Sequence, residues 1–130
     1  MPRENVAIVR RSYDHLARTG DFLWDLIDPE VEVHDPSSLP DAEVRHGHEG
    51  LGAGLASVKD SFDGVRFEVE QIYDAGEDVV VFVRMYARGK DSGVDLDVSV
   101  AHLITLGNGK LTKIRAMGRE EAMEATGLSE

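Results

Sequence analysis

His102 is the residue of this sequence whose type and setting most clearly indicate chemistry. It lies in the stretch from Val94 to Leu106, where the other even positions are aliphatic and the odd positions begin Asp95, Asp97, Ser99. This period of two is typical of a strand with one buried and one solvated face. A buried imidazole needs a hydrogen-bond partner or a wet cavity, because an unpaired buried polar group costs about 1–3 kcal/mol. We therefore expect the chain to enclose a pocket into which His102 points.

Asp35 and Tyr13 are the other two candidate catalytic residues. Asp35 follows a short expected strand and precedes Pro36, and a carboxylate facing an apolar pocket can act as a general base. Tyr13 lies in the apolar stripe of the first expected helix, and a phenol aimed into a cavity can donate to an oxyanion. The alternative for each residue is a purely structural role. His102 is then a core histidine whose hydrogen bonds are made within the protein, Asp35 caps a turn, and Tyr13 is an aromatic residue of the core.

The run His46-Gly47-His48-Glu49, with His34 and His15 elsewhere, raises the question of a metal. Zinc sites need three or four convergent ligands in a fixed geometry, and this spacing matches no such motif. A helix that begins after a glycine turn explains the run better. We predict no metal and no cofactor.

Composition narrows the class of protein. The 130 residues suffice for one domain, 1–130, with its own core. The chain has no cysteine, which excludes disulfides and thiolate sites. A net charge of −11 disfavours nucleic acid and anionic membranes as partners. No membrane-length apolar run and no signal-peptide pattern is present, so we expect a cytoplasmic protein.

Hydrophobic periodicity and turn residues predict an α+β order of elements, with helices first and antiparallel strands after them. The expected helices are Glu4–Arg18, Asp21–Ile27, Glu49–Phe62 and Arg119–Thr126, and the expected strands are Val31–Asp35, Val65–Asp74, Asp78–Gly89, Val94–Leu106 and Leu111–Met117. Pro36 to Gly47 is expected to be a loop. A long curved sheet wrapped around the N-terminal helices makes a cone with a pocket inside.

Strand alternation also predicts what lines this pocket and what lies outside it. The expected ligand-binding residues are Trp24, Val33, Leu55, Val83, Met85, Val100, Ile114 and Ala116. Such an apolar wall suits a small hydrophobic molecule. On the outer face, Val80, Phe82, Tyr86 and Leu103 form an apolar surface that favours a homodimer.

Four local motifs carry a resemblance to a known family: Val33-His34-Asp35-Pro36, Arg45-His46-Gly47-His48-Glu49-Gly50, Ala101-His102-Leu103 before the Gly-Asn-Gly turn, and Arg119-Glu120-Glu121-Ala122-Met123. With the order of elements, they resemble the nuclear transport factor two-like superfamily and its SnoaL-like branch over essentially the whole chain. The resemblance implies the cone-shaped, cystatin-like roll of ketosteroid isomerases, limonene epoxide hydrolases and polyketide cyclases.

The resemblance also suggests roles for individual residues. Tyr13 falls where ketosteroid isomerases keep an oxyanion tyrosine, and Asp35 where they keep the proton-shuttling aspartate. Their second oxyanion acid corresponds to His102 if turn lengths are matched, or to Ala101 by ungapped counting. SnoaL-like cyclases have a histidine on the same strand, but their partner aspartate corresponds to about Ala116.

The epoxide hydrolases need an Asp-Arg-Asp set, and the corresponding positions here are Val83, Met85 and Ala116. Two functions therefore remain open. One is a cofactor-independent isomerase or cyclase that transfers a proton next to a carbonyl, and the other is a non-catalytic small-molecule binding protein.

Overall fold

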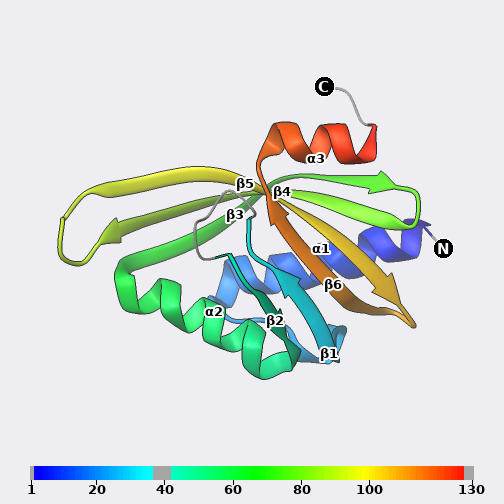
Figure 1. The fold of residues 1–130 in the computed structure, drawn as a ribbon, viewed down its shortest axis with the longest axis horizontal. Helices are drawn as coiled ribbons and strands as arrows, with labels where there is room; N and C mark the ends of the chain where they lie inside the picture. Colours follow the sequence, from blue (N-terminus) through cyan, green and yellow to red (C-terminus); the bar gives the residue numbers. More distant parts are fainter. Residues whose placement is uncertain (1, 37–41, 128–130) are drawn as a thin grey trace.

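The computed structural model describes residues 2–36 and 42–127. Their elements follow the expected α+β order: α1 (Pro2–Thr19), a 3-10 turn η1 (Trp24–Leu26), β1 (Ile27–His34), β2 (Val44–His46), α2 (Gly47–Ser61), β3 (Phe62–Ala75), β4 (Asp78–Gly89), β5 (Asp95–Gly107), β6 (Lys110–Met117) and α3 (Arg119–Thr126). Figure 1 shows them as a single curved sheet with helices on both sides. No helix within these ranges is long and apolar enough to cross a membrane.

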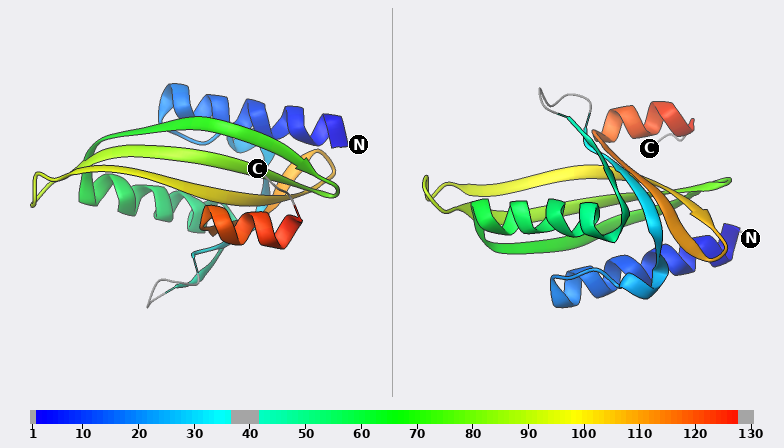
Figure 2. Two further views of the ribbon diagram at one scale, coloured as in Figure 1. Left: turned by 90° about the horizontal axis from the view of Figure 1, so that it is seen from above. Right: turned by 60° about the horizontal axis from the view of Figure 1, so that its bottom comes forward.

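The sheet has the strand order β2-β1-β6-β5-β4-β3. Strands β3 to β6 form the expected antiparallel meander. Its last hairpin turns at Asn108 and Gly109, which both have positive φ, as a type I′ turn requires. Strand β1 joins the other edge and runs parallel to β6. The long strands bend along their length (Figure 2), and the sheet stays open because its edges are β2 and β3.

Two apolar clusters cover the two faces of the sheet. The odd residues of β4, such as Val79, Val81 and Val83, belong to the cluster that contains Val9 of α1 and Leu51 of α2. Val80 and Phe82, on the other face of β4, belong to the second cluster, which includes Ala122 of α3. Strand alternation therefore decides which side chains can reach a cavity under α1 and α2.

The helix predicted over residues 21–27 is wrong. Only the turn η1 forms, and β1 begins at Ile27, which is 1% exposed and pairs with Leu111 of β6. Pairing with β6 thus extends the strand across Pro29, and the register shift between Ile27 and Glu32 accommodates a residue that has no N–H to donate.

The expected loop from 36 to 47 contains β2, which pairs with β1, and its residues 37–41 lie outside the described ranges. At the start of the His102 strand, Val94 is 65% exposed, because β5 begins only at Asp95.

The outer face is less available to a partner than the sequence suggests. Val80, Phe82 and Leu103 are at most 3% exposed, because α3 covers them with Ala122 and Met123. The expectation that these three side chains are free for a homodimer is wrong. Dimerisation through the rest of the outer face stays a prediction.

Candidate functional site

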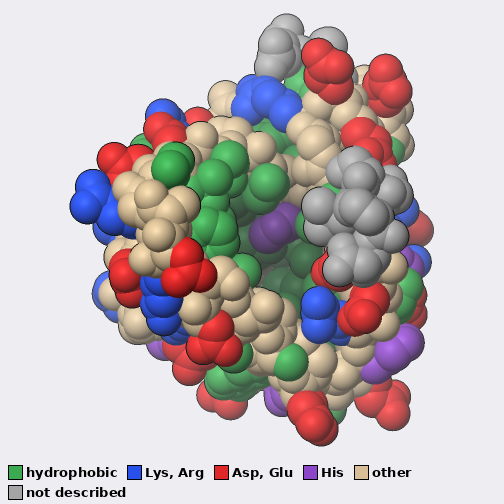
Figure 3. Space-filling model, turned by 60° about the vertical axis from the view of Figure 1, so that its left-hand side comes forward, with side chains coloured by type: hydrophobic (Ala, Val, Ile, Leu, Met, Phe, Trp, Pro, Cys, Tyr) green, Lys and Arg blue, Asp and Glu red, His purple; other side chains and the backbone are tan. Residues whose placement is uncertain are grey.

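A cavity of about 270 Å³ lies between α1, α2 and the inner face of the sheet. In the space-filling view it appears as a hollow lined with hydrophobic side chains, with a histidine inside it (Figure 3). Of the eight residues expected to bind ligand, seven line the cavity: Val33, Leu55, Val83, Met85, Val100, Ile114 and Ala116. Their role in binding stays a prediction.

Trp24 is not among the lining residues, which corrects the sequence-based expectation. Its ring packs instead against Phe22 and His48, with ring centroids 5.3 and 4.9 Å away. A Cβ added at Gly52 of α2 would lie 3.6 Å from the indole. The physical reason is that the helix predicted over residues 21–27 does not form. Trp24 lies instead in the short turn η1, where its ring packs against α2. Phe22 and Phe67 are aromatic lining residues that the sequence did not single out.

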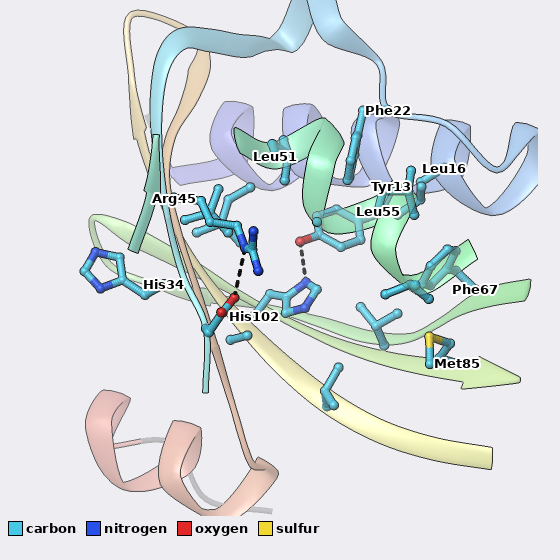
Figure 4. A pocket seen from close by; sticks show the side chains of 18 of the residues that line it. Tyr13, Leu16, Phe22, His34, Arg45, Leu51, Leu55, Phe67, Met85 and His102 are labelled. Carbon is cyan, nitrogen blue, oxygen red and sulfur yellow. Dashed lines mark hydrogen bonds and ion pairs between the residues drawn. The ribbon is translucent and has the colours of Figure 1, made fainter. Parts of the chain in front are cut away.

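The polar centre of the cavity is a hydrogen bond between Tyr13 and His102. The Tyr13 hydroxyl on α1 lies 2.7 Å from Nδ1 of His102 on β5, and Figure 4 shows both side chains in the pocket. Burial lowers the pKa of His102 to about 4 and raises that of Tyr13 above its ordinary value. Both groups are therefore neutral at pH 7.

A neutral pair of this kind presents hydrogen-bonding atoms of both residues to a ligand. Nε2 of His102 makes no hydrogen bond to the part of the chain that the structure describes, and His102 is only half-buried because it faces the cavity. If Tyr13 donates to Nδ1, the Nε2–H group is a donor toward the cavity. If Nδ1–H donates to Tyr13, the phenol keeps its own donor. In both tautomers one donor is left for a carbonyl oxygen.

The two positions matched to the second oxyanion acid lie on opposite faces of the sheet. Ala101 is fully buried in the outer cluster beneath α3, whereas His102 lines the cavity. Ala116 lies directly opposite His102 in the β5–β6 register and lines the same cavity. Its methyl group offers no carboxylate where cyclases of this kind have their aspartate.

Asp35 lines the same cavity as His102, where it follows β1. Its Oδ1 lies 3.5 Å from Nε of Arg45, and its Oδ2 accepts a hydrogen bond from the backbone N–H of Glu43. The backbone N–H of Asp35 in turn donates to the Glu43 carbonyl. The Asp35 side chain is thus fixed at the edge of an apolar pocket by one backbone hydrogen bond and by the ion pair with Arg45.

Arg45 also lines the cavity, and sequence reasoning missed it. It lies on β2 opposite Val33 of β1, in a strand that the sequence pattern presented as a loop. Two glycines on one face of α2 leave room for its side chain: a Cβ at Gly50 would lie 3.1 Å from the Arg45 Cβ, and one at Gly54 would lie 3.7 Å from its Cδ and Nε. The available signal is the glycine spacing within the helix predicted over Glu49–Phe62, because glycine is unfavourable inside a helix.

The remaining histidines have other partners. His34 pairs with Glu32 at the pocket rim, and its imidazole lowers the pKa of that carboxyl. Nε2 of His48 hydrogen-bonds the Ile27 carbonyl. Within the described ranges, no group of three or more histidine, aspartate or glutamate side chains is placed to hold a metal ion.

The comparison with known proteins agrees with this architecture. A sequence profile of SnoaL-like domains matches residues 9–114. The chain belongs to the SnoaL-like domain family. That match includes Tyr13, Asp35, Arg45 and His102 but assigns no role to any of them.

Solved structures similar to this SnoaL-like domain share its fold. Bal32a, from a soil-derived mobile gene cassette, is 21% identical with a TM-score of 0.76 over 88% of each chain. A putative SnoaL-like polyketide cyclase from Jannaschia is 24% identical with a TM-score of 0.74, covering 95% of this chain and 91% of that one.

TerC, which was co-crystallised with polyporic acid, is 22% identical with a TM-score of 0.74 and covers 95% and 97% of the two chains. No curated protein sequence matches this SnoaL-like domain. The fold family includes polyketide cyclases and isomerases. Because one fold hosts many functions, the function of this member has to be inferred from the residues of its site.

Proposed function

We propose that the pocket binds a small, largely apolar ketone and transfers a proton next to its carbonyl group without a cofactor. In this mechanism the Tyr13–His102 pair donates a hydrogen bond to the carbonyl oxygen, and Asp35 accepts the proton from the adjacent carbon. The observation that carries the proposal is the neutral Tyr13–His102 hydrogen bond, which faces the same apolar cavity as the Asp35 carboxylate.

Electrostatics favours this division of roles. A histidine with a pKa of about 4 is neutral at pH 7, so it acts as a hydrogen-bond donor and not as a strong base. Asp35 is a carboxyl group that lines the same cavity, and the guanidinium of Arg45 lies beside it. An apolar wall strengthens each of these interactions, since little water competes with them.

One observation favours the second candidate, a non-catalytic binding protein. Both carboxylate oxygens of Asp35 already have partners, Arg45 and the Glu43 N–H group. These contacts occupy part of the accepting capacity of the carboxylate and hold it in place. Binding alone would use the same apolar wall and the same carbonyl donor.

Deuterium exchange separates the two candidates. 2-Tetralone, a fused aromatic ketone with acidic C–H groups next to its carbonyl, is incubated with the protein in D2O, and deuterium uptake is followed by mass spectrometry. We expect the protein to accelerate uptake, and Asp35→Asn to abolish this acceleration while 2-tetralone binding persists. Binding without acceleration would remove the catalytic proposal and leave the binding protein. No binding of the ketone would count against both.

A further inference from the structure

The guanidinium of Arg45 lies near two carboxylates, but its N–H groups donate a hydrogen bond to neither. It lies 3.5 Å from Asp35 and 3.8 Å from Glu43, whereas a charge-assisted hydrogen bond spans about 2.7–2.9 Å. Within the described ranges it makes no hydrogen bond. Arg84 on the outer face differs, because its two nitrogens bind Asp97 at 2.6 and 2.7 Å.

These donors face the cavity in which the proposed reaction takes place. Arg45 lines the pocket and is 30% exposed. Figure 4 shows its guanidinium on the same side of the pocket as the Tyr13–His102 pair, away from Phe67 and Met85. Gly50 and Gly54 carry no Cβ, and this leaves room for the Arg45 side chain to extend from β2 to this position. A ligand in this cavity can therefore accept hydrogen bonds from its N–H groups.

We infer that Arg45 is a further catalytic residue, which binds the enolate oxygen when Asp35 becomes protonated, so that the pocket selects neutral ketones with an acidic α-C–H group. This inference rests on the proposed function and names the substrate class of the same site. In the step, the C–H bond breaks and its proton binds a carboxylate oxygen of Asp35. The electron pair of that bond delocalises onto the carbonyl oxygen, which becomes the new anionic partner of Arg45.

The physical advantage is that the number of charges near Arg45 stays constant. Before the transfer, the guanidinium faces the Asp35 carboxylate. After it, the guanidinium faces the enolate, and Asp35 is neutral. A charge moved between two acceptors beside the same cation costs much less than a new charge created in an apolar pocket. Arg45 is already in place before the reaction, as effective electrostatic stabilisation requires.

The same charges exclude a permanently anionic ligand. A carboxylate that entered the pocket would meet Arg45 while Asp35 and Glu43 are still ionised nearby. Three carboxylates would then compete for one guanidinium. The site is therefore selective for a molecule that arrives neutral and becomes an anion only by giving its proton to Asp35.

Equilibrium binding of two matched probes tests this inference. 2-Tetralone is the neutral probe and 2-naphthoate the anionic one, and both carry a fused two-ring body. Asp35→Asn is uncharged, as protonated Asp35 is, and nearly the same size, so this variant is a stable copy of the state after proton transfer. We expect it to bind 2-naphthoate about tenfold more tightly than the wild type, because one nearby like charge is gone, and to bind 2-tetralone unchanged.

Variants of Arg45 identify the group responsible. In the Asp35→Asn background, Arg45→Met should abolish the gain in 2-naphthoate affinity, and Arg45→Lys should restore part of it, because lysine keeps the charge but loses the fork of donors. Unchanged 2-tetralone affinity shows that the pocket remains intact. Arg84→Met removes an ion-paired arginine outside the pocket and should change neither affinity.

A gain that survives Arg45→Met, or no gain in Asp35→Asn, would overturn the inference. These affinities do not depend on turnover, so they decide the role of Arg45 even if the wild type fails to exchange deuterium. If the exchange does occur, Arg45→Met should slow it with unchanged 2-tetralone affinity. An exchange rate that Arg45→Met leaves at the wild-type value would also overturn the inference, while the proposed function would stand.

Discussion

The hydrogen bond between Tyr13 and His102 should be visible in the stability of the protein. Tyr13→Phe removes one oxygen atom and keeps the ring, which is only 6% exposed and packs in the core with Val9 and Val81. The apolar contacts of the ring therefore survive. The substitution acts on the 2.7 Å contact with Nδ1 of His102.

The expected loss follows from two contributions. A typical intramolecular hydrogen bond stabilises a protein by about 0.5–1.5 kcal/mol, and a buried partner left without one costs about 1–3 kcal/mol. Nδ1 of His102 becomes such a partner unless water from the cavity reaches it. We therefore expect Tyr13→Phe to lower the free energy of unfolding by about 1–3 kcal/mol. For a domain of this size, each kcal/mol corresponds to roughly 3–5 °C in Tm.

Urea denaturation at pH 7 measures this difference, and Tyr73→Phe is the matched control. Tyr73 is half-buried and packs edge-on against Phe82, but its hydroxyl makes no hydrogen bond within the described part of the chain. Its removal should change the free energy of unfolding by less than about 0.5 kcal/mol. Equal effects of the two substitutions would refute the assignment of the Tyr13 hydroxyl to His102.

Two further predictions concern pH and the α2 glycines. Folding lowers the pKa of His102 from an ordinary value near 6.5 to about 4, so in this window the unfolded chain binds a proton that the folded chain does not. Its stability should therefore fall from about pH 6.5 to pH 4, by up to about 1.4 kcal/mol per pH unit from this residue. Urea titrations across this range should show a flatter profile for His102→Gln, and parallel profiles would contradict the pKa. Gly54→Ala should raise the free energy of unfolding by about 0.5–1 kcal/mol, because its Cβ fits at 3.7 Å and alanine favours a helix. Gly50→Ala should gain less or destabilise, because its Cβ would meet the Arg45 Cβ at 3.1 Å. The same Tm gain in both variants, measured by thermal unfolding, would show that Arg45 does not fill this space.

Most of the fold was predictable because its signals are local. The period-two pattern around His102 specified β5 and its inward face, and the Asn-Gly pair specified the turn before β6. The same alternation placed Val83 and Met85 on the cavity wall. Gly20 and Gly127 mark the ends of α1 and α3, and both adopt the positive φ that favours glycine.

The errors arose where distant pairing competes with local preference. The local pattern predicts a helix over residues 21–27, but pairing with β6 makes Ile27 the first residue of a strand. β2 is short, and only its pairing with β1 defines it as a strand. The outer apolar residues Val80 and Phe82 suggested a dimer, whereas their partner is α3 of the same chain.

The sequence by itself determined the types of residue available for chemistry and the face of the strand on which His102 lies, because both follow from side-chain identity and a period of two. Tertiary structure alone decided their partners. Tyr13 reaches His102 only because α1 packs across the inner face of the sheet. Arg45 reaches Asp35 because β2 pairs with β1 beneath a glycine-lined helix. Such contacts join segments far apart in the chain, and no local pattern encodes the distance between them.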